Sequence, residues 1–127
     1  MYYIVDSSKS FEEAVTALDT AVKSNKFGVL HVHDIAATLR GKGFEFTEEC
    51  KVFEVCNPGQ ASKVMAVDLR LNMALPCRIS VYTEQGKTKI GMIEPAKMIT
   101  MLSNDASLAV IAKEVEASII KMIDESK

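Results

Sequence analysis

The chain has 127 residues and a formal charge of −2, from 15 lysines and arginines against 17 aspartates and glutamates. This length suits one domain, and 48% hydrophobic with 25% charged residues is typical of a globular protein rather than a disordered one. The near-neutral balance argues against a general nucleic-acid binder, and no apolar run approaches the roughly 18 residues of a membrane span. The N-terminus lacks a basic region followed by an apolar stretch, so we expect a cytoplasmic protein with a single domain over residues 1–127.

The first elements are a short β-prone stretch at residues 2–5 and a long amphipathic helix. Ser10 and Glu13 match a capping box, in which each side chain binds the main-chain N–H of the other residue. Apolar residues then recur every three or four positions on one helical face, at Phe11, Val15, Leu18 and Val22. The pattern predicts a helix that begins at Ser10 and ends near Lys26.

Residues 27–33 follow as a predicted strand that carries both histidines of the chain. Strict alternation places Val29, His31 and His33 on one face of the strand. Two imidazoles at this spacing can bind a metal, but a metal site needs three or four convergent ligands and the sequence places no third. We therefore favour a structural role for the pair.

Asp34 is positioned to cap a short helix that Gly41 ends. This role explains Asp34 without the alternative, an acid–base pair with His33. Residues 43–49 are polar and are predicted to form a loop, and residues 51–56 a strand, since three of them are β-branched or aromatic.

A strong helix start comes next, with Asn57 as the cap, Pro58 at the first helical position and Gln60 where a capping-box partner belongs. The expected apolar face consists of Ala61, Val64, Met65 and Leu69. The helix should end before Asn72, because Pro76 forces the residue before it to be extended.

The C-terminal third contains a predicted hairpin and the best-supported helix of the chain. Strands at 77–83 and 88–94 flank a turn at 84–87, so they must be antiparallel. A helical turn is expected at 97–102. The helix predicted at 105–124 shows an apolar stripe at Leu108, Ile111, Val115, Ile119 and Met122.

Taken together, the element order is β-α-β-α-β-α-β-β-α. It predicts a two-layer α+β sandwich in which helices pack on one face of a mainly antiparallel sheet. The order of the central strands is not readable from this pattern. Because three or four helices cannot cover both faces of the sheet, we expect a homodimer.

The region from His33 to Pro95 resembles the Domain of Unknown Function 302 family. The residues that carry this resemblance are Phe27-Gly28-Val29-Leu30, His33-Asp34, Phe53-Glu54-Val55-Cys56-Asn57-Pro58, Ala61, Leu75-Pro76-Cys77-Arg78-Ile79-Ser80-Val81-Tyr82 and Gly86. The resemblance implies a two-layer fold like a single copy of the TATA-box-binding-protein fold. It implies no biochemical activity, and the shared fold does not bring DNA binding with it, since function depends on sites.

Two cysteines stand at predicted strand ends. Cys56 precedes a helix N-terminus, where the helix dipole can lower a thiol's pKa, and Cys77 precedes the positive charge of Arg78. The two thiols share a pocket only if those strand ends lie at the same edge of the sheet. An odd count of three cysteines argues against a disulfide framework, and free cysteine is commonly a small core residue.

These observations leave two classes of function open. The favoured one is a non-catalytic module that binds a small molecule or anion near Cys56, Asn57, Cys77, Arg78 and His33, in the segments Cys56-Asn57-Pro58 and Pro76-Cys77-Arg78. The alternative is a thiol-based redox or soft-metal protein that uses Cys56 and Cys77. Methionines clustered in sequence, Met92, Met98 and Met101, could add thioether ligands for copper(I), but we favour the interpretation that they fill gaps in the core or line a partner surface.

Overall fold

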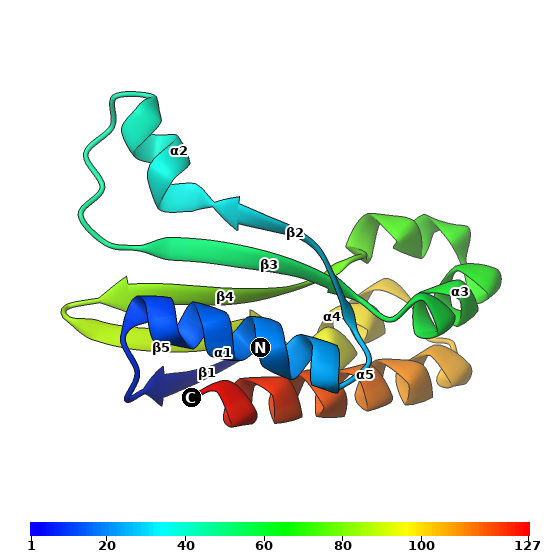
Figure 1. Ribbon diagram of the computed structural model, residues 1–127. Helices are drawn as coiled ribbons and strands as arrows, with labels where there is room; N and C mark the ends of the chain where they lie inside the picture. The colour runs from blue at the N-terminus through cyan, green and yellow to red at the C-terminus, as the bar shows by residue number, and fades with distance from the viewer.

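The computed structural model describes residues 1–127 as a five-stranded antiparallel sheet with helices packed against it (Figure 1). The order of strands across the sheet is β1-β5-β4-β3-β2, and every neighbouring pair is antiparallel. The strands are β1 (Tyr2–Ser7), β2 (Gly28–Asp34), β3 (Cys50–Cys56), β4 (Cys77–Glu84) and β5 (Lys87–Ile93). The predicted α+β class is confirmed.

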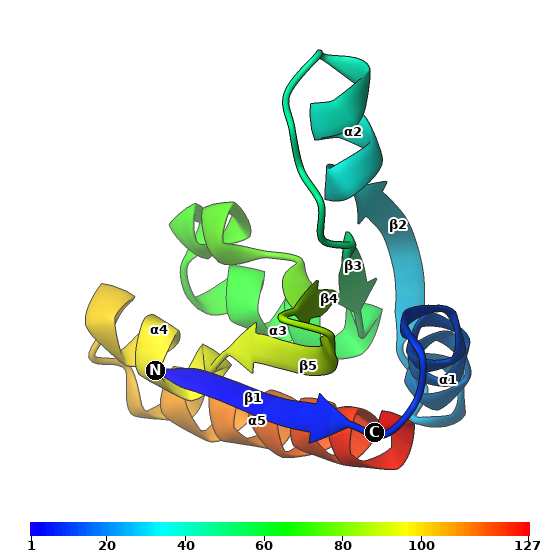
Figure 2. The ribbon, with the colours of Figure 1, turned by 90° about the vertical axis from the view of Figure 1, so that its left-hand side faces the viewer.

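Two long helices, α1 (Phe11–Ser24) and α5 (Ala106–Ser126), cover one face of the sheet (Figure 2). The short helix α2 (Ile35–Gly41) continues from the end of β2 and projects away from the rest of the chain. At the opposite end of the sheet lie three further elements, namely α3 (Pro58–Val67), the 3₁₀-helix η1 (Leu69–Ala74) and α4 (Pro95–Leu102). None of the helices combines the length and the hydropathy that crossing a bilayer requires.

The main core fills the space between the sheet and the helices α1 and α5. Its fully buried side chains include Leu18, Phe53, Ile79, Ile90 and Ile119. A smaller core joins α3, η1, α4 and the first half of α5 at one end of the sheet. The other face of the sheet is open and bears the outward-pointing residues of each strand, among them His33, Glu54, Arg78, Lys89 and Ile4.

Most helix starts follow the side-chain signals of the sequence. Ser10 and Glu13 form the complete capping box, with N···O distances of 3.2 and 3.0 Å. Asp34 accepts a hydrogen bond from the main-chain N–H of Ala37 at 2.9 Å, and Asp105 caps α5. These bonds satisfy first-turn N–H groups that have no partner within the helix.

Strand β2 departs from strict alternation, and the predicted face of Val29 is therefore wrong. Val29 is opposite Val55 and packs against the core, whereas His31 is opposite Glu54 on the open face. A β-bulge between Val29 and His31 inserts one extra residue, which reverses the side-chain alternation.

The helix after Asn57 also differs from its predicted apolar face. Helix α3 ends at Val67, and Leu69 lies in the 3₁₀-helix η1 with 70% of its surface exposed. Asp68 ends the first helix and caps the second by accepting a bond from Arg70 N at 3.0 Å. Because the extended backbone of Asp68 separates the two helices, Leu69 does not continue the apolar face of α3, whereas Leu71 of η1 is buried.

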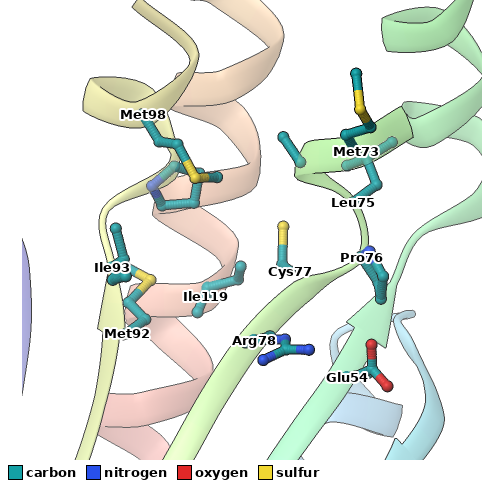
Figure 3. Close-up of a pocket in the computed structure, with 12 residues that line it drawn as sticks. Glu54, Met73, Leu75, Pro76, Cys77, Arg78, Met92, Ile93, Met98 and Ile119 are labelled. Atoms are coloured by element: carbon teal, nitrogen blue, oxygen red, sulfur yellow. The ribbon is translucent and has the colours of Figure 1, made fainter. Parts of the chain in front are cut away.

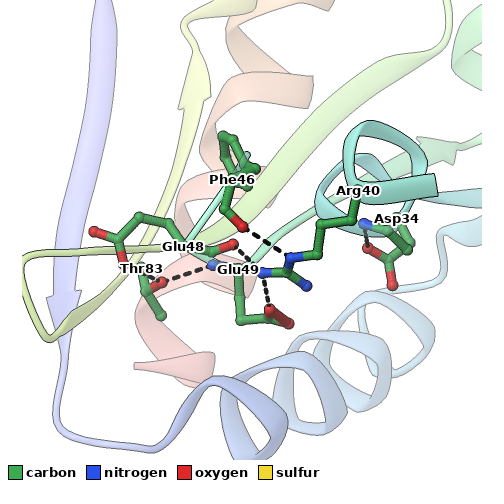
Figure 4. A network of polar contacts seen from close by, with 7 residues as sticks. Asp34, Arg40, Phe46, Glu48, Glu49 and Thr83 are labelled. Carbon is green, nitrogen blue, oxygen red and sulfur yellow. Dashed lines mark hydrogen bonds and ion pairs between the residues drawn. The ribbon is translucent and has the colours of Figure 1, made fainter. Parts of the chain in front are cut away.

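The hairpin end of the sheet is tied to the loop before β3 by a network of polar contacts (Figure 4). Glu48 accepts hydrogen bonds from Thr83 Oγ1 at 2.9 Å and from the main-chain N of Gln85 at 2.8 Å. Arg40 binds the main-chain carbonyls of Phe46 and Glu48, both at 2.8 Å, and the carboxylate of Glu49. The loop at 43–49 is thus held in place although it has no regular secondary structure.

Candidate functional site

Strands β4 and β5 are paired over only part of their length. Their pairing runs from Glu84 and Lys87, beside the turn, to Ser80 and Gly91. Beyond that point, the segment Cys77–Ile79 pairs only with β3, and the end of β5 pairs only with β1. The sheet is therefore split between β4 and β5 at the end away from the hairpin.

A cavity of about 280 Å³ lies in this split (Figure 3). Its walls are mostly apolar and come from six elements, with a sulfur-bearing side chain on four of them: Cys77 on β4, Met92 on β5, Met73 on η1 and Met98 on α4. Ile119 of α5 closes the side that faces the core. The volume equals that of about nine water molecules in the liquid.

Glu54 and Arg78 are the charged residues that line this cavity. They face each other across β3 and β4 as direct cross-strand partners. Glu54 Oε1 lies 2.6 Å from Nε2 of His33 on β2. This hydrogen bond, followed by the nearby charges of His33 and Arg78, lowers the pKa of Glu54. Glu54 is therefore ionised at neutral pH and acts as the acceptor, so Nε2 of His33 carries the proton.

The guanidinium of Arg78 is exposed at the mouth of the cavity and forms no hydrogen bond or ion pair. The other two arginines each bind a carboxylate, Arg40 that of Glu49 and Arg70 that of Asp68. Arg78 differs because the carboxylate of its cross-strand partner, Glu54, is engaged by His33. Five N–H donors are thus available to a ligand at this point.

A second, much smaller cavity of about 30 Å³ contains both predicted thiols. Cys56 and Cys77 line it together with Asn57 and Gln60. The two strand ends therefore do meet at one edge of the sheet, and Cys77 is a wall shared by both cavities. The space is enough for about one water molecule.

Neither thiol has the lowered pKa that the helix start and the arginine led us to expect. Burial raises the pKa of Cys56. Burial, reinforced by the neighbouring Cys56, raises the pKa of Cys77 to about 11. Desolvation in apolar surroundings disfavours the charged thiolate and so raises the pKa of a thiol.

The structure separates the remaining predicted site residues. Asn57 caps α3 by accepting a bond from Gln60 N at 3.2 Å, and it does not line the cavity of Arg78. His33 acts on that cavity only through Glu54. His31 stacks edge-on against His33 with ring centroids 4.4 Å apart, and no group of three or more histidine, cysteine or acidic side chains is placed to hold a metal ion.

Sequence reasoning missed several residues of the site, above all Glu54, Met73 and Ile119. The charged Glu54 between the apolar residues Phe53 and Val55 was a usable signal, but the residues that Glu54 contacts depended on the strand order. Met73 and Ile119 approach the cavity from η1 and α5, and no local pattern connects them to Arg78.

The fold and the site define a two-layer α+β protein with a ligand-sized cavity in a split antiparallel sheet. The family model for the "Domain of unknown function DUF302" matches residues 3–126. A crystal structure of an uncharacterized conserved protein DUF302 from Bacillus stearothermophilus superposes with a TM-score of 0.94 at 35% identity, covering 99% of this chain and 98% of that one. No curated protein matches the chain. The chain belongs to the DUF302 family.

Proposed function

We propose that this protein is a non-catalytic module that binds a small molecule with an apolar body and an acidic group. The body fills the cavity between β4 and β5, and the acidic group binds Arg78. The observation that carries the proposal is the cavity itself, which opens where two central strands separate and ends at an arginine without a partner.

The walls of the cavity favour an apolar ligand body. Ligand sites are usually concave and mostly apolar, with a few placed polar groups that fix orientation. Methionine side chains are flexible and polarisable, so Met73, Met92 and Met98 can adapt to ligands of different shape. Met73 is 80% exposed and lies at the rim, where its movement would cost little.

The charges at the mouth favour an acidic group. Arg78 presents a planar fork of donors that matches a carboxylate in a bidentate pair. The carboxylate of Glu54 opposes an anion, but its hydrogen bond with His33 at 2.6 Å holds it toward β2. His33 therefore supports the site indirectly, by drawing the competing charge away from the guanidinium.

The test is a titration of small carboxylic acids followed by backbone amide NMR. We expect the acids to shift the amides of residues 77–79, 92 and 93, and Arg78→Gln to weaken binding by about tenfold, as for a lost charge-assisted hydrogen bond. Arg70→Gln is the matched control, because Arg70 is exposed and does not line this cavity. Equal binding by both variants, or no shift at these amides, would refute the proposal.

A soft-metal function is the second candidate, because one thiol and three thioethers line the same cavity. Such sulfur ligands suit copper(I), although binding through Cys77 must displace the proton of a thiol whose pKa is about 11. Titration with silver(I), a redox-stable monovalent probe, decides between the candidates. One tightly bound equivalent that Cys77→Ser abolishes would favour the metal.

A thiol-redox role has the least support, because burial raises the pKa of both Cys56 and Cys77. The thiolate is the reactive species. We expect Cys77 to resist iodoacetamide in the native protein at neutral pH and to react only on unfolding, measured by mass spectrometry. Alkylation of Cys77 at the rate of a free cysteine would favour the thiol-redox role over the other two candidates.

A further inference from the structure

The split in the sheet exposes main-chain groups as well as side chains. Successive residues of an antiparallel strand point their N–H and C=O groups to alternate sides. In the segment Cys77–Ile79, one side is used by β3, and the side toward β5 has no strand partner. Met92 and Ile93 are in the same position on β5, paired with β1 on one side only.

Two facing strand edges therefore border the cavity. The unpaired N–H and C=O groups of a strand edge can hydrogen-bond with another extended main chain. They therefore favour ligands that contain an amide group. A simple aliphatic acid would place alkyl carbon against these polar groups and leave them without hydrogen bonds, which is unfavourable.

From this arrangement we infer that the ligand of the proposed site is an N-acylated α-amino acid with an apolar side chain. The inference rests on the proposed function and makes its ligand class specific. The amide of the ligand pairs with the free edge of β4 or β5, the carboxylate binds Arg78, and the side chain enters the methionine-lined space. The three contacts use three groups that an N-acyl amino acid carries on its single Cα atom.

The size of the cavity agrees with this class. A volume of about 280 Å³ equals that of about nine water molecules at about 30 Å³ each. Covalently bonded atoms lie closer together than separate water molecules, so a ligand of about a dozen non-hydrogen atoms matches the same volume. N-acetyl-L-leucine is of this size. A longer chain would have to leave the cavity, since Ile119 of α5 closes one side and Met98 of α4 another.

The experiment compares three probes by amide NMR titration of the full chain. They are N-acetyl-L-leucine, its ester analogue with oxygen in place of the amide nitrogen, and the carboxamide N-acetyl-L-leucinamide. We expect the ester to bind about tenfold more weakly, because it lacks one hydrogen-bond donor, and the carboxamide to lose at least as much, because it has no charge for Arg78. Arg78→Gln should abolish the preference for the acid over the carboxamide, and Arg70→Gln should retain it.

The outcomes separate the two proposals. If the acid and its ester bind equally well at the cavity, the inference about the amide is overturned and the proposed function stands. If no carboxylate probe binds there, both are overturned. A fourth probe, N-acetyl-Gly-Gly-Leu, tests whether the ligand is a free N-acyl amino acid or the C-terminal residue of a peptide. If this peptide binds more than tenfold tighter than N-acetyl-L-leucine, the ligand is a peptide C-terminus, and the inference of a small-molecule ligand is overturned.

Discussion

The two ends of the β4–β5 pair differ in whether the strands are hydrogen-bonded to each other. At the hairpin end, the strands are paired up to the turn, where Gln85 and Gly86 both have positive φ, and the Glu48 carboxylate binds Thr83 and the turn itself. At the other end, pairing stops at Ser80 and Gly91, and a cavity takes its place. The same two strands thus contribute a closed end and an open end.

This difference indicates which parts of the chain stabilise the fold and which are available for the proposed binding. At the closed end, the polar groups of the turn and the loop before β3 satisfy one another (Figure 4). At the open end, Arg78 and the edges of two strands keep their hydrogen-bonding capacity. Substitutions at the closed end and in the core should therefore affect unfolding, and those around the cavity should mainly affect binding.

The largest effect is expected where the sheet is paired and buried. Ile90 is fully buried between β1 and β4, and Ile90→Ala should lower the free energy of unfolding by about 3 kcal/mol through lost burial and a new void. Met98→Ala, which only enlarges an existing cavity, should cost less than about 1 kcal/mol, since alanine also favours the helix. Urea unfolding of both variants measures the contrast, and equal losses would contradict it.

The next effect is expected at Gly91, the last residue at which β5 pairs with β4. An added Cβ there would lie 2.8 Å from Ile4 Cγ1 and 2.9 Å from the main-chain oxygen of Tyr3. Because a main-chain atom of β1 must move, Gly91→Ala should destabilise the protein by about 1–3 kcal/mol. Gly41→Ala is the control, since its Cβ would meet nothing within 4 Å. Thermal unfolding should show a lower midpoint for the first variant alone.

A smaller effect is expected from the polar network of the closed end. Thr83→Val keeps the side-chain shape but removes the bond to Glu48 and the acceptor for the main-chain N of Glu49. The loss should be about 1 kcal/mol. Thr100→Val removes an exposed hydroxyl bond on α4 and should cost less than about 0.5 kcal/mol. Chemical denaturation distinguishes the two, and a neutral Thr83→Val would mean that the network adds nothing to stability.

The smallest effect on stability is expected from a substitution on the open face of the sheet, which tests whether this face forms a homodimer. The expected homodimer stays a prediction, and the exposed Tyr2, Ile4 and Ile93 on β1 and β5 give it a surface. Light scattering should give twice the 13.9 kDa mass of the chain, and Tyr2→Lys should give a folded monomer whose midpoint of unfolding no longer depends on protein concentration. A monomer for the unsubstituted protein at high concentration would end this expectation.

The sequence was informative wherever a structure depends on neighbouring residues. The capping box of Ser10, the Asn57-Pro58 helix start and the turn at residues 84–87 act over a few positions, and each was confirmed. The helix stripes predicted at 10–26 and 105–124 correspond to α1 and α5, because burial against a sheet imposes the helical period. The α+β class followed from the order of these elements.

Local irregularities were less accessible. The bulge in β2 reversed the face of Val29, and the change to a 3₁₀-helix exposed Leu69. Both depend on which strand or core the segment packs against, and local periodicity carries little information about that.

The candidate site was predicted in part. Cys77 and Arg78 were named from local chemistry, and both line the cavity between β4 and β5, whereas Cys56 and Asn57 line the smaller one. Glu54, Met73 and Ile119 were not foreseen, and Met98 was named only as a candidate thioether ligand for copper(I). They come from elements far apart in the sequence, and the order β1-β5-β4-β3-β2 alone determines that their elements meet.

The sequence by itself thus determined the elements, their caps and the class of the fold, because those follow from hydrogen bonds and burial within short stretches of chain. The tertiary structure alone decided that β4 separates from β5, that His33 engages Glu54, and that Arg78 has no partner. Those three features depend on strand order and on where pairing ends, which are set by the packing of the whole chain.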